Sequence, residues 1–154
     1  MKRNTVNLTR IISVVCAVLM LALLVCQFIP FWNLDGREAS IGGYIWLESH
    51  YDGFTAYFQE WLNDGDFYSG SIVGVNVILM LACAAGIVFC IKNSEELWPI
   101  VFPAACGILG LYQYLAIPVF QLGSNCGIHL AICIATLVMA IIALIAWVRD
   151  RKTA

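Results

Sequence analysis

Four long runs of apolar residues dominate the chain, separated by two short polar segments and one long one. The runs cover residues 11–29, 70–91, 97–120 and 127–148, and none contains Asp, Glu, Lys or Arg. At about 1.5 Å of rise per residue, each run can cross a hydrocarbon core of about 30 Å as one α-helix. The pattern predicts an all-α integral membrane protein with four transmembrane helices, forming a single domain over residues 1–154.

The lengths of the connections predict how these helices are arranged. Residues 92–96 and 121–125 are short links, so the helices that they join should be antiparallel neighbours. The segment of residues 30–69 is too long, and too rich in aromatic side chains, to be a structureless loop. We therefore expect an antiparallel four-helix bundle, a tetraspan layout, with a small folded cap at one end.

Two patterns predict the elements of the cap. Residues 40–48 alternate between two faces, which favours a short strand paired with the stretch after Pro30 through a turn at LDGRE. Residues 51–64 have a helical period, and aromatic residues of the kind found there settle at a membrane–water boundary. We expect an interfacial amphipathic helix seated over the bundle end. Its apolar face consists of Phe54, Tyr57, Phe58, Trp61 and Leu62.

Small and polar residues recur within the runs at steps of three and four, which keeps them on one face of each helix. Helices in lipid pack through small residues and hydrogen-bonding side chains, so these faces should form the bundle interior. The pairs Gly70/Gly74 and Gly123/Gly127 would also let backbones approach closely at the cap end. The predicted interior positions are Ser13, Cys16, Met20, Leu23, Gln27, Asn76, Cys83, Cys90, Pro103, Cys106, Gly110, Gln113, Cys126, His129, Cys133, Thr136, Ala140 and Ala143.

Four interior positions carry polar side chains in the half of the membrane nearer the cap: Gln27, Asn76, Gln113 and His129. An amide without a hydrogen-bond partner at that depth costs several kcal/mol. Two interpretations stay open. The four side chains line a small polar pocket for a ligand that the sequence does not identify, or they form an interhelical hydrogen-bond cluster, typically worth about 0.6 kcal/mol per pair.

Two features of the runs bear on transport. Proton- or ion-coupled transport usually needs an ionisable acid or base within the membrane, and the four runs contain no Asp, Glu, Lys or Arg. Pro103 and Pro118 remove backbone donors from the third run, which frees the carbonyls of Pro99 and Tyr114. Such prolines are tolerated in membrane helices and do not by themselves indicate gating.

Composition and charge add an orientation. The chain is 62 % hydrophobic and 12 % charged, far from the balance of a soluble protein. Seven of the eight Lys and Arg residues lie near the run ends away from residues 30–69. The positive-inside rule makes that side cytoplasmic, together with both termini, in a plasma (inner) membrane. The 30–69 segment, which carries seven acidic residues against one arginine, is then extracytoplasmic.

The seven cysteines lie in the runs or at their ends, and none forms a C-x-x-C motif. They are best interpreted as small buried hydrophobic side chains. A disulfide between Cys26 and Cys126 is the alternative, because both lie near the cap ends of their helices. Two histidines and a neighbouring cysteine do not specify a metal site, so the sequence indicates no metal and no cofactor.

The layout resembles that of claudins and related tetraspan proteins. That family has four spans, cytoplasmic termini, and a larger first outer loop with Trp, then Gly-Leu-Trp, then two cysteines. Here the loop has Trp32 and the stretch GYIW at residues 43–46, and it has no cysteine. The resemblance covers topology alone and implies no residue roles.

The function class follows from what the sequence contains and lacks. It has no nucleophile elbow, phosphate-binding glycine loop or paired-carboxylate signature, which predicts a protein that is not an enzyme. The acidic loop and sparse basic charge exclude nucleic acid as a partner. Besides the lipid bilayer, we expect a protein partner or homo-oligomer, with the chain acting as a structural or interaction module or as a subunit of a membrane complex. The alternative is an oligomeric channel or permease component with the polar cluster as its vestibule.

Overall fold

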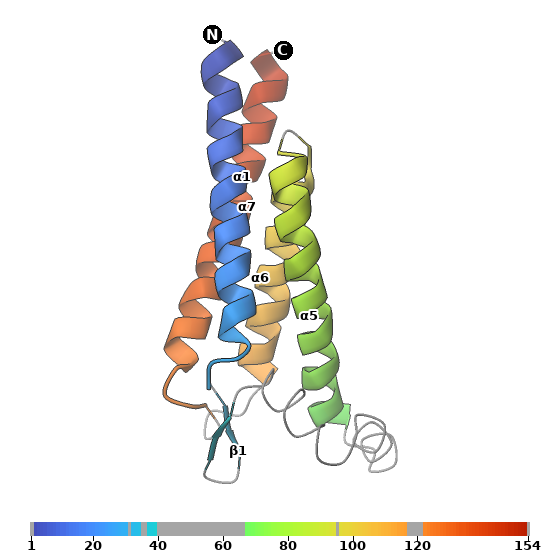
Figure 1. Ribbon diagram of the computed structural model, residues 1–154, viewed down its shortest axis with the longest axis vertical. Helices are drawn as coiled ribbons and strands as arrows, with labels where there is room; N and C mark the ends of the chain where they lie inside the picture. Colours follow the sequence, from blue (N-terminus) through green and yellow to red (C-terminus); the bar gives the residue numbers. More distant parts are fainter. Residues whose placement is uncertain are drawn as a thin grey trace.

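The computed structural model describes residues 2–30, 32–34, 37–39, 67–94, 96–116 and 122–153. In this part of the chain four long helices run side by side: α1 (Lys2–Cys26), α5 (Phe67–Lys92), α6 (Trp98–Ala116) and α7 (Cys126–Thr153) (Figure 1). Each contains a stretch long and apolar enough to cross a membrane, namely Leu8–Cys26, Gly74–Lys92, Trp98–Ala116 and Cys126–Arg151. The prediction of a multi-pass bundle of four apolar helices is confirmed.

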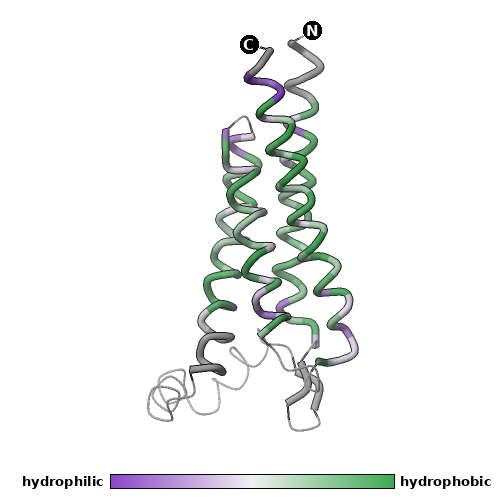
Figure 2. Tube along the Cα trace, turned by 180° about the vertical axis from the view of Figure 1, so that it is seen from behind, coloured by the Kyte–Doolittle hydropathy of each residue, from purple (hydrophilic) through white to green (hydrophobic). Residues whose placement is uncertain are grey.

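The two ends of the bundle differ. Both termini lie at one end, which we call the N/C end, and a two-stranded sheet lies at the other, which we call the hairpin end (Figure 1). α1 and α7 project beyond the turn between α5 and α6 at the N/C end (Figures 1 and 2). Figure 2 shows apolar residues along most of the length of the helices, with hydrophilic residues gathered towards the ends.

The sheet consists of β1 (Trp32–Leu34) and β2 (Arg37–Ala39), which pair antiparallel with Asn33 opposite Glu38. The two remaining elements expected in the cap are the strand over residues 40–48 and the amphipathic helix over residues 51–64. Both lie outside the described residues, and so does the apolar face of that helix. They stay predictions.

The four helices form a ring in the order α1, α5, α6, α7, with α1 and α6 also in contact across it. Glycines permit these close approaches. A Cβ added to Gly86 of α5 would lie 2.6 Å from the Sδ of Met20, and one added to Gly110 of α6 would lie 2.6 Å from the Sγ of Cys133 and 3.4 Å from Leu23. A larger residue at either position would force a neighbouring side chain to shift, since a real Cβ is not found that close to other heavy atoms.

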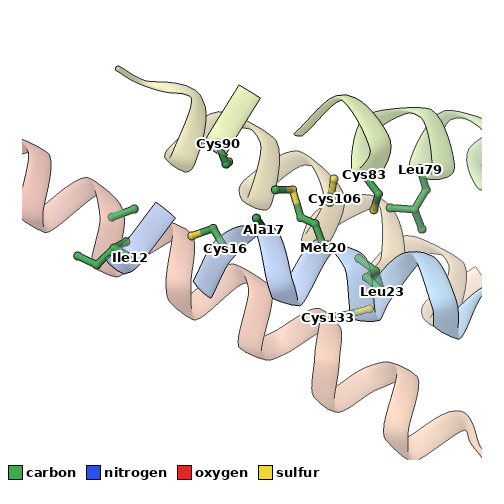
Figure 3. Close-up of a cluster of buried hydrophobic side chains, with 11 residues drawn as sticks. Ile12, Cys16, Ala17, Met20, Leu23, Leu79, Cys83, Cys90, Cys106 and Cys133 are labelled. Carbon is green, nitrogen blue, oxygen red and sulfur yellow. The ribbon is translucent and has the colours of Figure 1, made fainter. Parts of the chain in front are cut away.

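The bundle interior consists of the faces predicted from the spacing. All of the eighteen predicted interior residues are buried except Cys126, which is half-buried. Figure 3 shows Met20 and Leu23 of α1 lying among Cys83, Cys106 and Cys133 of the other three helices. Thiols fill the narrow spaces of this core, as expected of small hydrophobic side chains.

Two side chains of α1 bind backbone carbonyls of its neighbours near the N/C end. Ser13 donates its hydroxyl to the carbonyl of Cys90, which lies in the last turn of α5 and has no helical donor there. One turn along, Cys16 donates its thiol to the carbonyl of Pro99 at 3.6 Å. This is the carbonyl that Pro103 was expected to free, and α1 supplies the missing donor.

α1 ends three residues before the end of the apolar run. The backbone amides of Gln27, Phe28 and Ile29 each bond to the carbonyl three residues before, at 3.0–3.2 Å, so the chain tightens into a final turn. The cause is Pro30, because a residue that precedes a proline disfavours the α-helical conformation.

Candidate functional site

Three of the four predicted polar side chains are hydrogen-bonded to one another inside the bundle. Gln27 lies in the turn directly after α1, Asn76 on α5 and His129 on α7. The Nδ2 of Asn76 donates to the Oε1 of Gln27 at 2.7 Å, and the Nε2 of Gln27 lies 3.3 Å from the Nε2 of His129. Each of these side chains is at most 1 % exposed. The contacts join three helices near the hairpin end.

The direction of these bonds is linked to the histidine tautomer. The amide nitrogen of Gln27 can only donate, and its two hydrogens are directed to the carbonyl of Leu23, at 3.2 Å, and to His129. With the Gln27 amide in this orientation the Nε2 of His129 accepts, and the Sγ of Cys133 lies 3.8 Å from Nδ1 and 4.0 Å from Nε2 of the same ring. Polar contacts thus continue from Asn76 through Gln27 and His129 to Cys133.

Gln113 belongs to the same layer by helix geometry. Gly110 approaches both Leu23 and Cys133. Gln113 lies one turn from Gly110 towards the hairpin end, as Gln27 does from Leu23 and His129 does from Cys133. Its side chain is fully buried. The four polar residues therefore share one level of the bundle.

This polar layer is only partly satisfied. Three buried amide atoms have no hydrogen-bond partner among the described residues: the Oδ1 of Asn76 and both the Oε1 and the Nε2 of Gln113. Two acceptors and one donor are the groups that would bind a buried water or another small polar molecule. The layer thus agrees in part with both interpretations. Its bonds between helices are those of a hydrogen-bond cluster, and its unpaired amide atoms are those expected in a polar pocket.

The other candidate residues at this end do not form a chemical centre. Cys26 is buried, Cys126 is half-buried, and both carry free thiols in the structure, so the disulfide between them stays a prediction. Within the described ranges, no three His, Cys, Asp or Glu side chains come together as they would around a metal ion.

One contact at this end was not foreseen from the sequence. The Nδ2 of Asn125 donates to the carbonyl of Pro30 at 2.8 Å, which joins the start of α7 to the segment after α1. The only sign of this bond in the sequence was the position of Asn125 just before a helix. The glycine pairs were expected to let backbones approach closely at this end, but a Cβ added to Gly74 or Gly127 would meet no described residue within 4 Å. Among the described residues, these two glycines therefore make no close approach.

Comparison with known proteins adds no relative. No protein-family model matches the chain. No curated protein and no solved structure is significantly similar to it. The class is therefore defined by the fold alone, and it is that of a multi-pass membrane protein.

Proposed function

We propose that this multi-pass membrane protein is a non-enzymatic structural or interaction module, acting as a partner subunit of a larger membrane complex. In this proposal the N/C end faces the cytoplasm and residues 30–69 lie outside the plasma (inner) membrane. The distribution of Lys and Arg supports that orientation.

The observation that carries the proposal is the use of polar groups between helices. Asn76, Gln27 and His129 bond to one another, and Ser13 and Cys16 bond to backbone carbonyls of neighbouring helices. Between these two polar levels, the buried positions of α1 are the apolar residues Ala17, Met20, Leu23 and Cys26. Such an interior stabilises one arrangement of helices, which is what a structural module requires.

A surface feature supports a partner. Gly74 of α5 and Gly127 of α7 are exposed near the hairpin end, and a Cβ added to either would meet no described residue within 4 Å. Gly is the residue that lets helices in lipid approach most closely, and neither of these two makes such an approach to another described helix. They are suited to contact with a helix of another chain.

Co-purification from the native membrane in mild detergent tests the proposal. We expect the chain to elute with a stoichiometric protein partner or as a homo-oligomer. Gly74→Leu should reduce this association without lowering the stability of the bundle, because a Cβ at this position meets no described residue within 4 Å. Gly110→Leu is the matched control, since it should unfold the bundle. A lone monomer, with no co-purifying protein, would overturn the proposal.

A second candidate function is that of an oligomeric channel or permease component. The observation that favours it is Gln113, whose buried amide has no partner among the described residues. Such an amide could form hydrogen bonds with a polar solute that passes through the bundle, instead of with another helix.

Flux measurements in proteoliposomes separate the two candidates. For a permease, the purified protein should support flux of small polar solutes, and Asn76→Leu or Gln113→Leu should abolish it. Leu81→Ala, a substitution at a lipid-exposed position of α5, is the control and should leave flux unchanged. Absence of flux from the unaltered protein would remove this candidate.

A further inference from the structure

An open groove lies at the N/C end, where α7 passes the turn between α5 and α6. Its volume is about 520 Å³, within the range of about 300–1,000 Å³ that is usual for ligand pockets. The groove is distant from the polar layer at the hairpin end, and the proposed subunit function makes no use of it. Its walls are formed by Glu96, Leu97, Trp98, Val101, Trp147 and Arg151.

Two opposite charges are held on this groove by aromatic side chains. The Nε1 of Trp98 donates to the Oε2 of Glu96 at 2.6 Å, which orients the carboxylate. The guanidinium of Arg151 lies 4.0 Å above the ring centre of Trp147. An arginine held over an aromatic ring at this distance keeps N–H groups for hydrogen bonds to other partners. The groove therefore offers an anionic and a cationic side chain, each in contact with a tryptophan.

The position of the groove matches the boundary of a membrane. Trp98 begins the membrane-crossing stretch of α6, and Arg151 ends that of α7. Tryptophan is enriched at the level of lipid headgroups, and charged residues lie just beyond the hydrocarbon. Leu97 and Val101 are 45 % and 48 % exposed, so apolar surface continues from the charged groups along α6.

We propose that this groove binds a phospholipid whose headgroup carries a phosphate and a primary ammonium, as phosphatidylethanolamine does. The phosphate accepts hydrogen bonds from the guanidinium of Arg151, a geometry that suits arginine. The ammonium donates to the carboxylate of Glu96, and the acyl chains lie along Leu97 and Val101. The partner is thus a zwitterionic lipid, recognised by both of its charges.

Other headgroups fit less well. Phosphatidylglycerol has no cation, so its phosphate would place a second negative charge beside the carboxylate of Glu96 without an opposite charge to balance it. Phosphatidylcholine has no N–H to donate, and a quaternary ammonium is usually held on open aromatic faces. Here the ring of Trp147 is covered by Arg151, and the ring of Trp98 packs against Phe89 and Phe102 at centroid distances of 5.1 and 5.7 Å.

Native mass spectrometry of the purified full chain, titrated with each of the three lipids in mixed micelles, tests the proposal. We expect phosphatidylethanolamine to bind about tenfold more tightly than the other two, as one additional charge-assisted hydrogen bond would give. Glu96→Gln should remove this preference, and Arg151→Gln should weaken binding of all three lipids. Arg10→Gln is the matched control, because Arg10 is an exposed arginine of α1 that does not line the groove.

Two results would overturn the proposal. One is equal affinity of the unaltered protein for the three lipids, a comparison that needs no variant to fold. The other is displacement of the lipid by inorganic phosphate or by soluble glycerophosphoethanolamine at equal concentration, which would assign the groove to a soluble phosphate compound. Retention of the lipid under both competitors supports the role of the acyl chains.

Discussion

The thiol of Cys16 on α1 lies 3.6 Å from the carbonyl oxygen of Pro99 on α6. Pro103 cannot donate to this carbonyl as an ordinary residue of α6 would, so the unpaired acceptor becomes a binding point for another helix. A proline that weakens one helix thereby strengthens its contact with a second.

Cys16→Ala should lower the free energy of unfolding by about 0.5 kcal/mol, a usual value for a hydrogen bond between membrane helices. In a Pro103→Ala background the same substitution should lower the free energy of unfolding by less, because the new N–H can bond to the carbonyl of Pro99. Unfolding in detergent followed by circular dichroism measures both, and Cys16→Ser should retain most of the stability. Equal losses in the two backgrounds would show that the thiol acts through packing alone.

Asn76→Leu should destabilise the bundle by about 1–2 kcal/mol, because it leaves the Oε1 of Gln27 buried without its donor. Adding Gln27→Leu should cost less than the two single substitutions together, since both partners are then apolar. A double-mutant cycle on unfolding free energies measures the coupling. Strict additivity would mean that the 2.7 Å contact contributes no stability.

Gln113→Leu should raise the free energy of unfolding by about 1 kcal/mol if Gln113 is a packing residue, because the substitution removes an unpaired buried amide. Thermal unfolding of the purified protein measures this. A loss of stability would instead indicate that Gln113 binds a water or a polar molecule in the folded protein. Leu109→Met, a conservative change at a half-buried position of the same helix, is a suitable control.

Thiol labelling should distinguish the cysteines. Cys126 is half-buried and the other six are buried, so maleimide should modify Cys126 first in the folded protein. Prior oxidation should suppress this labelling if Cys26 and Cys126 form the predicted disulfide, and Cys26→Ser should restore it. Unchanged labelling and unchanged monomer mobility on a gel, with and without reductant, would contradict the disulfide.

Much of the bundle could be predicted because its determinants are local. The number of helices follows from the length of each apolar run, and the interior face follows from residues such as Ser13, Met20 and Cys133 at steps of three and four. The freed carbonyl of Pro99 was also predictable, since the absence of an N–H on Pro103 is a property of the residue itself. The residues on the interior face of each helix are therefore expected to be buried.

Which residues meet, and which groups are left unpaired, depended on the tertiary structure. Gln27 and Asn76 are 49 positions apart, and the depth and rotation of two helices decide whether their amides touch. Among the described residues, the same variables leave the amide of Gln113 unpaired and Gly74 without a close neighbour on another helix. By itself the sequence determined the helices and their inner faces, because hydrophobic length and helical period act within one segment. Only the packed bundle decided the contacts, because rotation and depth are properties of pairs of helices.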